Sequence, residues 1–198
     1  MLNEVHKPHI STNELRKTCD DVQVDEQLVA FLADARRYCV AMETDIPDNS
    51  REFAQQCLIL VLRLYERVLL LPNLEPETAD GLDLIGHEAW QAQRKRIAQK
   101  LSRDSYWCVF EPFEPEKPES IVASISDDLA DIWRDLKAGL TEIDSGKATS
   151  ISDAVWHWRF SFEAHWAQHA AGAIFALTAL CFGQFDDTNG SEGTKEGR

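Results

Sequence analysis

Two groups of side chains in this sequence could perform chemistry, and the first is a run of aspartates. Asp127, Asp128, Asp131 and Asp135 share one expected helix, and at helical spacing they project within an arc of about 100°. Carboxylate oxygens are the ligands that hard cations such as Mg²⁺ prefer. The alternative role is the solvated face of an amphipathic helix, where Asp127 and Asp128 favour the positive end of the helix dipole. We favour this second role.

The second group is a pair of histidines, His165 and His169, one helical turn apart in the middle of an expected apolar stripe. Imidazoles at this spacing can reach one metal ion, as in HExxH helices, although no glutamate follows His165 and the motif itself is absent. His157 lies about 80° from His165 on the same helix and is a weaker candidate. The alternative is that these rings find hydrogen-bond partners within the core, which is the commoner outcome and the one we favour. For Glu163 we expect a structural ion pair with Arg159, one turn away.

The two groups would form one site only if their helices pack together. We expect His165 and His169 to be largely buried and at least one of them to hydrogen-bond a carboxylate of Asp128, Asp131 or Asp135, because buried polar rings need partners. A carboxylate partner should raise the histidine pKa above about 6.5. These five residues are therefore the candidate ligands for a divalent metal ion, and the sequence assigns no other cofactor.

The elements that must position these residues follow from apolar periodicity. We expect helices from Asp25 to about Glu43, from Ser50 as N-cap to Leu71, from about His87 to Ser102, from a cap at Ser124 or Ser126 to about Glu142, and from a cap at Ser150 or Ser152 to Phe182, with Gly183 as C-cap. The last helix carries apolar residues on two faces, which predicts a central position. The fold class is thus all-α, a single-domain helical bundle of about five main helices with a long central C-terminal helix.

The remaining segments are expected to be irregular. Residues 106–110 have strand-like composition, but no second strand is apparent, so we expect an extended segment docked on the helices. Residues 1–23 should form an irregular N-terminal segment, residues 24–183 the helical domain, and residues 184–198 a disordered tail, because the tail lacks large apolar side chains.

Composition limits the classes of partner. The formal net charge is -14 and the pI is about 4.8, so the surface repels phosphate backbones and nucleic acid is not an expected partner. The five cysteines include no CxxC pair and are expected to be reduced thiols. No secretory signal is apparent at the start, and the apolar stretch 53–71 carries three charges near its centre. We expect a cytoplasmic protein without a membrane span.

Four sets of motifs resemble a bacterial family catalogued only as a domain of unknown function. They are Leu64–Tyr65 through Leu71–Pro72 with Glu75–Pro76; Tyr106–Trp107 to Phe110–Glu111–Pro112; Asp127 to Ile132 with Asp135–Leu136–Lys137 and Gly139–Leu140; and Trp158 to Glu163 with His165–Trp166 and His169. The resemblance covers roughly residues 25 to 180. It implies a bacterial, cytoplasmic origin and brings no activity, substrate or cofactor.

No complete catalytic set can be assembled from these residues. This favours an uncharacterised protein-binding or regulatory module with a protein partner. The alternative is an enzyme, either a metal-dependent hydrolase or a phosphate-processing enzyme, in which the aspartates and histidines bind a divalent metal.

Overall fold

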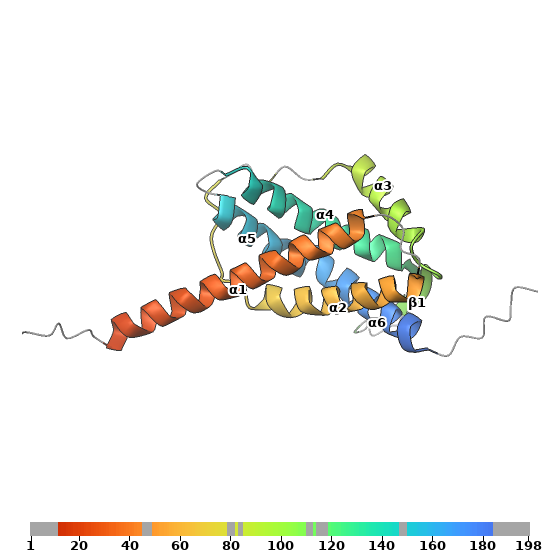
Figure 1. Cartoon of the computed structure of the whole chain (residues 1–198), viewed down its shortest axis with the longest axis horizontal. Coiled ribbons are helices and arrows are strands. Elements are labelled where there is room, and N and C mark those ends of the chain that lie inside the picture. The colour runs from red at the N-terminus through yellow and green to blue at the C-terminus, as the bar shows by residue number, and fades with distance from the viewer. Residues whose placement is uncertain are drawn as a thin grey trace, which may run out of the picture.

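Five helices and one β-hairpin make up the described part of the chain (Figure 1). The structure is a computed structural model that describes residues 12–44, 49–78, 82, 85–109, 113, 119–146 and 150–183, with side chains from Glu26 onward. The helices are α1 Thr12–Glu43, α2 Ser50–Leu69, α3 His87–Ala98, α4 Ile125–Asp144, and a last helix in three parts, α5 Ser150–Ser161, the π-helical turn η1 Phe162–Trp166 and α6 Ala167–Phe182. Helices account for more than half of the chain, which confirms the all-α prediction.

The first helix is longer than predicted. It begins at Thr12, so the expected start at Asp25 and the irregular segment 1–23 were wrong for residues 12–23. Apolar periodicity marks only the part of a helix that packs, and Figure 1 shows the first half of α1 extending beyond the other helices. Residues 1–11 and the tail 184–198 lie outside the described residues.

Capping explains where α2 and α4 begin. The N-cap of α2 is Asn49, not Ser50, because the Asn49 side chain accepts hydrogen bonds from the backbone N–H groups of Arg51 and Glu52. Ser124, one of the two predicted caps, caps α4 by accepting from the backbone N–H of Asp127. The helices α2 and α3 end at Leu69 and Ala98, two and four residues earlier than expected.

The helix α4 packs against α1, α3, α5 and α6. Its apolar residues Leu129, Ile132 and Leu136 are fully buried. The long C-terminal helix is confirmed; it packs against both α2 and α4. Its outward side carries Phe160, which stacks on Trp156 and is 56% exposed.

The segment 105–109 is a strand with a partner. Strand β1 Ser105–Val109 pairs antiparallel with β2 Ser120–Ser124, and Tyr106 lies opposite Ala123. The expectation of a lone extended segment was therefore wrong, because a second strand of only five residues is too short for its alternation to stand out. The hairpin is fixed to the start of α4, since Asp104 accepts from the backbone N–H groups of Ile125 and Ser126.

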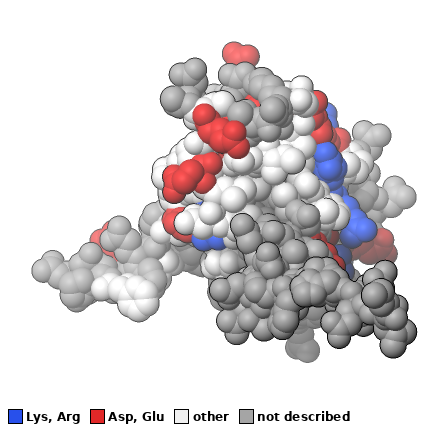
Figure 2. All heavy atoms as spheres, turned by 90° about the vertical axis from the view of Figure 1, so that its left-hand side faces the viewer, with Lys and Arg blue, Asp and Glu red and all other residues white. Residues whose placement is uncertain are grey.

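The surface charge and the free cysteines are those expected from the composition of the chain. Figure 2 shows one end of the bundle, where acidic side chains gather on one side and most Lys and Arg lie along the opposite edge, next to further acidic side chains. Cys39, Cys57, Cys108 and Cys181 are free thiols, and burial raises the pKa of Cys39 to about 12. None of the described helices is long and apolar enough to cross a membrane.

Candidate metal centre

The aspartates of α4 and the histidines of the last helix meet where these helices pack together. The Nδ1 atom of His165 lies 2.9 Å from Oδ2 of Asp135, and Nδ1 of His169 lies 2.9 Å from Oδ1 of Asp128. An ionised carboxylate can only accept, so each Nδ1 is protonated and donates. The predicted hydrogen bonds between the two groups are confirmed.

The other nitrogens of the two imidazoles face Asp131. The Nε2 atom of His165 lies 3.9 Å from Oδ1 of Asp131, and Nε2 of His169 lies 3.6 Å from Oδ2. Ligand atoms from the three residues all fall within 4.8 Å of one another. A tetrahedral zinc ion bound at about 2.0–2.1 Å would space its ligand atoms about 3.3–3.5 Å apart. The Asp131 distances of 3.9 and 3.6 Å are slightly longer than this spacing, so the three side chains would have to move closer together to enclose an ion.

The five predicted residues thus divide into two roles. Asp131, His165 and His169 are close enough to one another that they could hold a metal ion, whereas Asp128 and Asp135 bond to the Nδ1 atoms of the imidazoles. Histidine ligands in proteins nearly always donate their second N–H to such a partner, which fixes the tautomer and the ring orientation. The arrangement can therefore present two lone pairs and a carboxylate to one cation.

The burial of the site differs from both expectations. The side chains of His165 and His169 are 35% and 22% exposed, so the prediction that they are largely buried holds only in part, and both rings reach solvent. Asp128, Asp131 and Asp135 are buried, so the expectation of a solvated aspartate face was wrong. The last helix covers these carboxylates, and the imidazoles contact Asp128 and Asp135 from the solvent side.

The π-helical turn explains the exposure of the histidines. In η1 the backbone N–H of Ala167 bonds to the carbonyl of Phe162, which adds one residue to the turn. The buried positions from the last residue of this turn onward include Trp166, Ala170, Ala173, Leu177 and Cys181. The predicted stripe through His165 and His169 assumed uniform α-helical spacing. The extra residue moves both histidines from the middle of the stripe to its flank.

The site carries an excess of negative charge. Burial raises the pKa values of Asp128 and Asp131, although nearby histidines, and Arg134 in the case of Asp131, act in the opposite direction. Arg134 forms an ion pair of 2.8 Å with Asp131. Burial alone would lower the pKa of His169, but the hydrogen bond to Asp128 and the charge of Asp131 outweigh it, and the pKa is raised. A divalent cation would offset the excess charge of these buried carboxylates.

Tyr106 is a member of the site that the sequence did not reveal. Its hydroxyl group donates to Oδ2 of Asp128 at 2.7 Å, so Asp128 joins Tyr106 to His169. Burial and this hydrogen bond raise the pKa of Tyr106. Only the register of the hairpin could have placed this residue, and that register depends on the unrecognised strand β2.

The remaining candidates lie apart from the three ligand residues. Asp127 pairs with Arg94 at 3.2 Å, so the four aspartates do not gather around one magnesium ion. His157 is buried, and burial lowers its pKa despite the charge of Asp135. Glu163 lies 3.7 Å from Arg159, which confirms the expected ion pair.

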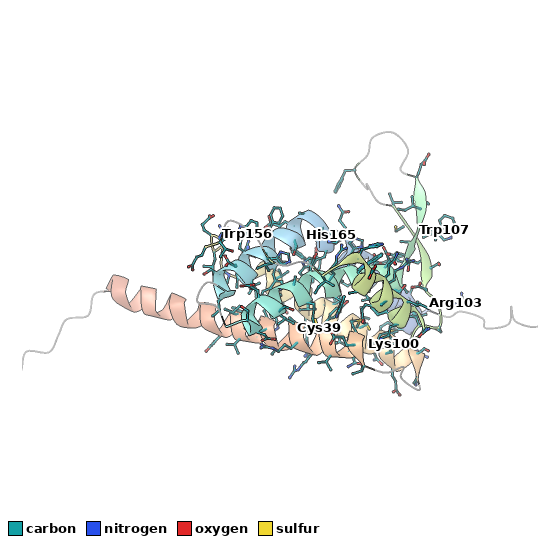
Figure 3. The ribbon with its side chains drawn as sticks, turned by 90° about the horizontal axis from the view of Figure 1, so that it is seen from above. Cys39, Lys100, Arg103, Trp107, Trp156 and His165 are labelled. Carbon is teal, nitrogen blue, oxygen red and sulfur yellow. The ribbon has the colours of Figure 1, made fainter. Side chains whose placement is uncertain are left out.

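An open cavity of about 840 Å³ lies beside the centre, between the hairpin and α6. Asp127, Asp128, Gln168 and His169 contribute its polar lining, and much of the rest is apolar: Trp107, Val109, Ile121, Val122, Ala171 and Phe175. Figure 3 shows the hairpin with Trp107 standing out from the helices, and His165 on the last helix. The cavity gives a bound molecule a path to His169.

Comparisons with known proteins identify a family and a fold. The family model described as "Domain of unknown function (DUF5063)" matches residues 22–182, so the chain belongs to this family. The fold is similar to the crystal structure of protein BF1032 from Bacteroides fragilis, with a TM-score of 0.68 and 22% identity over 81% of this chain and 96% of that chain. No protein with a curated description matches the sequence.

Proposed function

We propose that this member of the DUF5063 family binds a divalent transition-metal ion through Asp131, His165 and His169 and uses it in hydrolytic chemistry. One observation carries the proposal: both Nε2 atoms face Asp131, while each Nδ1 is held by a separate buried carboxylate. Three protein ligands leave a coordination position for water or substrate, as in catalytic zinc sites.

The donor set selects among metals. Two imidazoles and one carboxylate suit Zn²⁺, Fe²⁺ and Mn²⁺ better than Mg²⁺ or Ca²⁺, which prefer oxygen ligands. The two histidines are four residues apart, and His165 lies in the π-helical turn. Their imidazoles, and not the buried carboxylates, therefore face solvent. Zinc is therefore the first metal to test, with magnesium as the negative comparison.

Metal analysis of protein purified without an affinity tag tests the proposal. We expect about one equivalent of metal per chain, removable by a chelator and restored by Zn²⁺ in calorimetric titration. His169→Ala should lower the zinc affinity by at least about 100-fold because a ligand is lost. Glu163→Gln is the control, since Glu163 lies in the π-helical turn beside His165 and its side chain is 71% exposed. A native protein that takes up no zinc at micromolar concentration contradicts the proposal.

A second candidate is a protein-binding module, supported by the exposed apolar side chains of the hairpin. Trp107, Ile121 and Val122 are exposed, and such patches mark interaction sites. In this case the hairpin contacts a partner, and the metal plays no part. Removal of the metal should then leave partner capture unchanged, whereas Trp107→Ala should abolish it.

A further inference from the structure

We infer that the cavity beside the metal centre binds a small molecule with an apolar body and an uncharged polar group, such as the carbonyl of an ester or amide, and disfavours phosphates. One part of this inference rests on the proposed function: the orientation of the polar group of the ligand toward the metal. The apolar part of the cavity stands on its own observations. It favours the hydrolase over the phosphate-processing enzyme, the two enzymes that the sequence left open.

The size of the cavity matches a small organic ligand. Its volume is about 840 Å³, and cavities for such ligands commonly measure about 300–1,000 Å³. Two separate elements form its walls, the hairpin and α6. On the side of α6, the small side chain of Ala171 leaves room for a ligand beneath the hairpin.

The walls carry apolar side chains that no other described element covers. Trp107 is 67% exposed and Phe175 is 64% exposed, although both line the cavity. Val122 is also exposed on β2. Contact with an apolar ligand would remove these surfaces from water, at about 25 cal/mol for each Å². Such walls suit a hydrocarbon or aromatic body.

The polar lining includes residues of the metal centre. His169 and Asp128 line the cavity directly, and Asp127 lies beside them. Neither Lys nor Arg occurs among the described residues that line the cavity. In the metal-free protein a phosphate would therefore meet two carboxylates, and the His169 imidazole, which could carry a positive charge, is already paired with Asp128, which disfavours anionic ligands.

A cationic ligand fits this lining less well than an uncharged one. Both oxygens of Asp128 already accept hydrogen bonds, one from His169 and one from Tyr106. Asp127 is paired with Arg94. A divalent ion next to His169 would repel an ammonium group. An uncharged carbonyl oxygen can instead approach the metal as a ligand, so the charge pattern favours esters and amides.

Fluorescence titration with N-phenyl-1-naphthylamine, an uncharged apolar probe, tests the cavity in the full chain without metal. We expect saturable binding of one probe per chain. Trp107→Ala and Phe175→Ala should each weaken binding by about 5- to 10-fold, the loss of one aromatic contact. Both side chains are exposed, so neither substitution should unfold the protein. Phe160→Ala is the matched control, because Phe160 is a similarly exposed phenylalanine outside the cavity. Equal weakening in the control would overturn the inference.

A matched pair of competitors tests the charge preference. Methyl octanoate and octyl phosphate share an eight-carbon body, and we expect the ester to displace the probe at concentrations about tenfold lower or more. Equal displacement, or better displacement by the phosphate, would contradict the inference. Zinc should tighten binding of the ester and leave the probe unaffected. A chain that binds the probe but no zinc would refute the proposed metal function while the apolar cavity stands.

Discussion

A β-carbon at position 172 would overlap the hydroxyl oxygen of Tyr106. Gly172 of α6 therefore lets the Tyr106 hydroxyl pass close to the helix backbone and reach Asp128 at 2.7 Å. The other oxygen of Asp128 holds the imidazole of His169. One buried carboxylate thus ties together the hairpin, α4 and α6, and a change in the hairpin can alter the orientation of a metal ligand.

Gly172→Ala should displace Tyr106 and lower zinc affinity by about tenfold, the lower end of effects on groups that orient a ligand. Tyr106→Phe should have a similar effect because it removes the hydroxyl. In that background the methyl group added by Gly172→Ala would no longer overlap the hydroxyl oxygen. Gly172→Ala should therefore cost little more in the Tyr106→Phe variant, which a double-mutant cycle of zinc affinities measures. Fully additive losses would contradict the link between the two residues.

Asp131→Asn should stabilise the metal-free protein while it removes metal binding. Burial raises the pKa of Asp131, so its ionised form is disfavoured in the folded state at neutral pH. The neutral amide should raise the free energy of unfolding by about 1 kcal/mol in urea denaturation at pH 7. Zinc affinity should fall by at least about 100-fold, because Asp131 is the carboxylate ligand.

Asp127→Asn provides the control for this substitution. Asp127 lies four residues earlier on α4, but its side chain is more exposed and pairs with Arg94. Both the stability and the zinc affinity should change little, within about 0.5 kcal/mol. A large stability loss in Asp131→Asn would show that the carboxylate is structural, through its ion pair with Arg134.

The different surroundings of His169 and His157 should separate their pKa values in an NMR titration of metal-free protein. The carboxylate partners raise the pKa of His169, whereas burial lowers that of His157. The stabilisation from His169 is present below the unfolded pKa of about 6.5 and is lost as pH rises through the higher folded value. His157 has the opposite effect. Because burial lowers its folded pKa, the free energy of unfolding decreases as pH falls below the unfolded pKa of about 6.5. A depressed pKa for His169 would contradict its pairing with Asp128.

Sequence periodicity was informative where helices are regular and partly buried. It predicted the last part of α1, the cores of α2, α3 and α4, and the five residues that meet at the site. It could not predict the π-helical turn, because one extra residue between Phe162 and Ala167 leaves no local signature in apolar spacing. This single residue decides whether His165 and His169 lie in the core or at its edge.

The sequence also could not predict contacts between segments that are far apart in the chain. The aspartates of α4 are buried because the last helix covers them, so a polar face on one helix did not imply contact with solvent. Tyr106 reaches Asp128 only through the pairing of β1 with β2. The N-cap Asn49 differs from the predicted Ser50 by one residue, a choice between two good capping side chains that only the backbone geometry resolves.

Deletion of Ala164 should disrupt the metal site and leave the fold intact. A π-helical turn is an α-helix with one inserted residue, and Ala164 is an exposed position within η1. Its removal should restore regular α-helical spacing and leave the segments before Phe162 and after Ala167 in their present orientations. His165 would then turn away from Asp135 and Asp131, while His169 would keep its bond to Asp128.

We therefore expect the deletion variant to retain its helical content by circular dichroism and to lose zinc affinity by at least about 100-fold, since a ligand is displaced. Ala164→Gly is the control, because it keeps the chain length and changes only an exposed side chain. It should bind zinc normally, at a stability cost of about 1 kcal/mol at most. If the deletion variant binds zinc as tightly as the native chain, the π-helical turn does not position His165, and the assignment of this residue as a ligand is wrong.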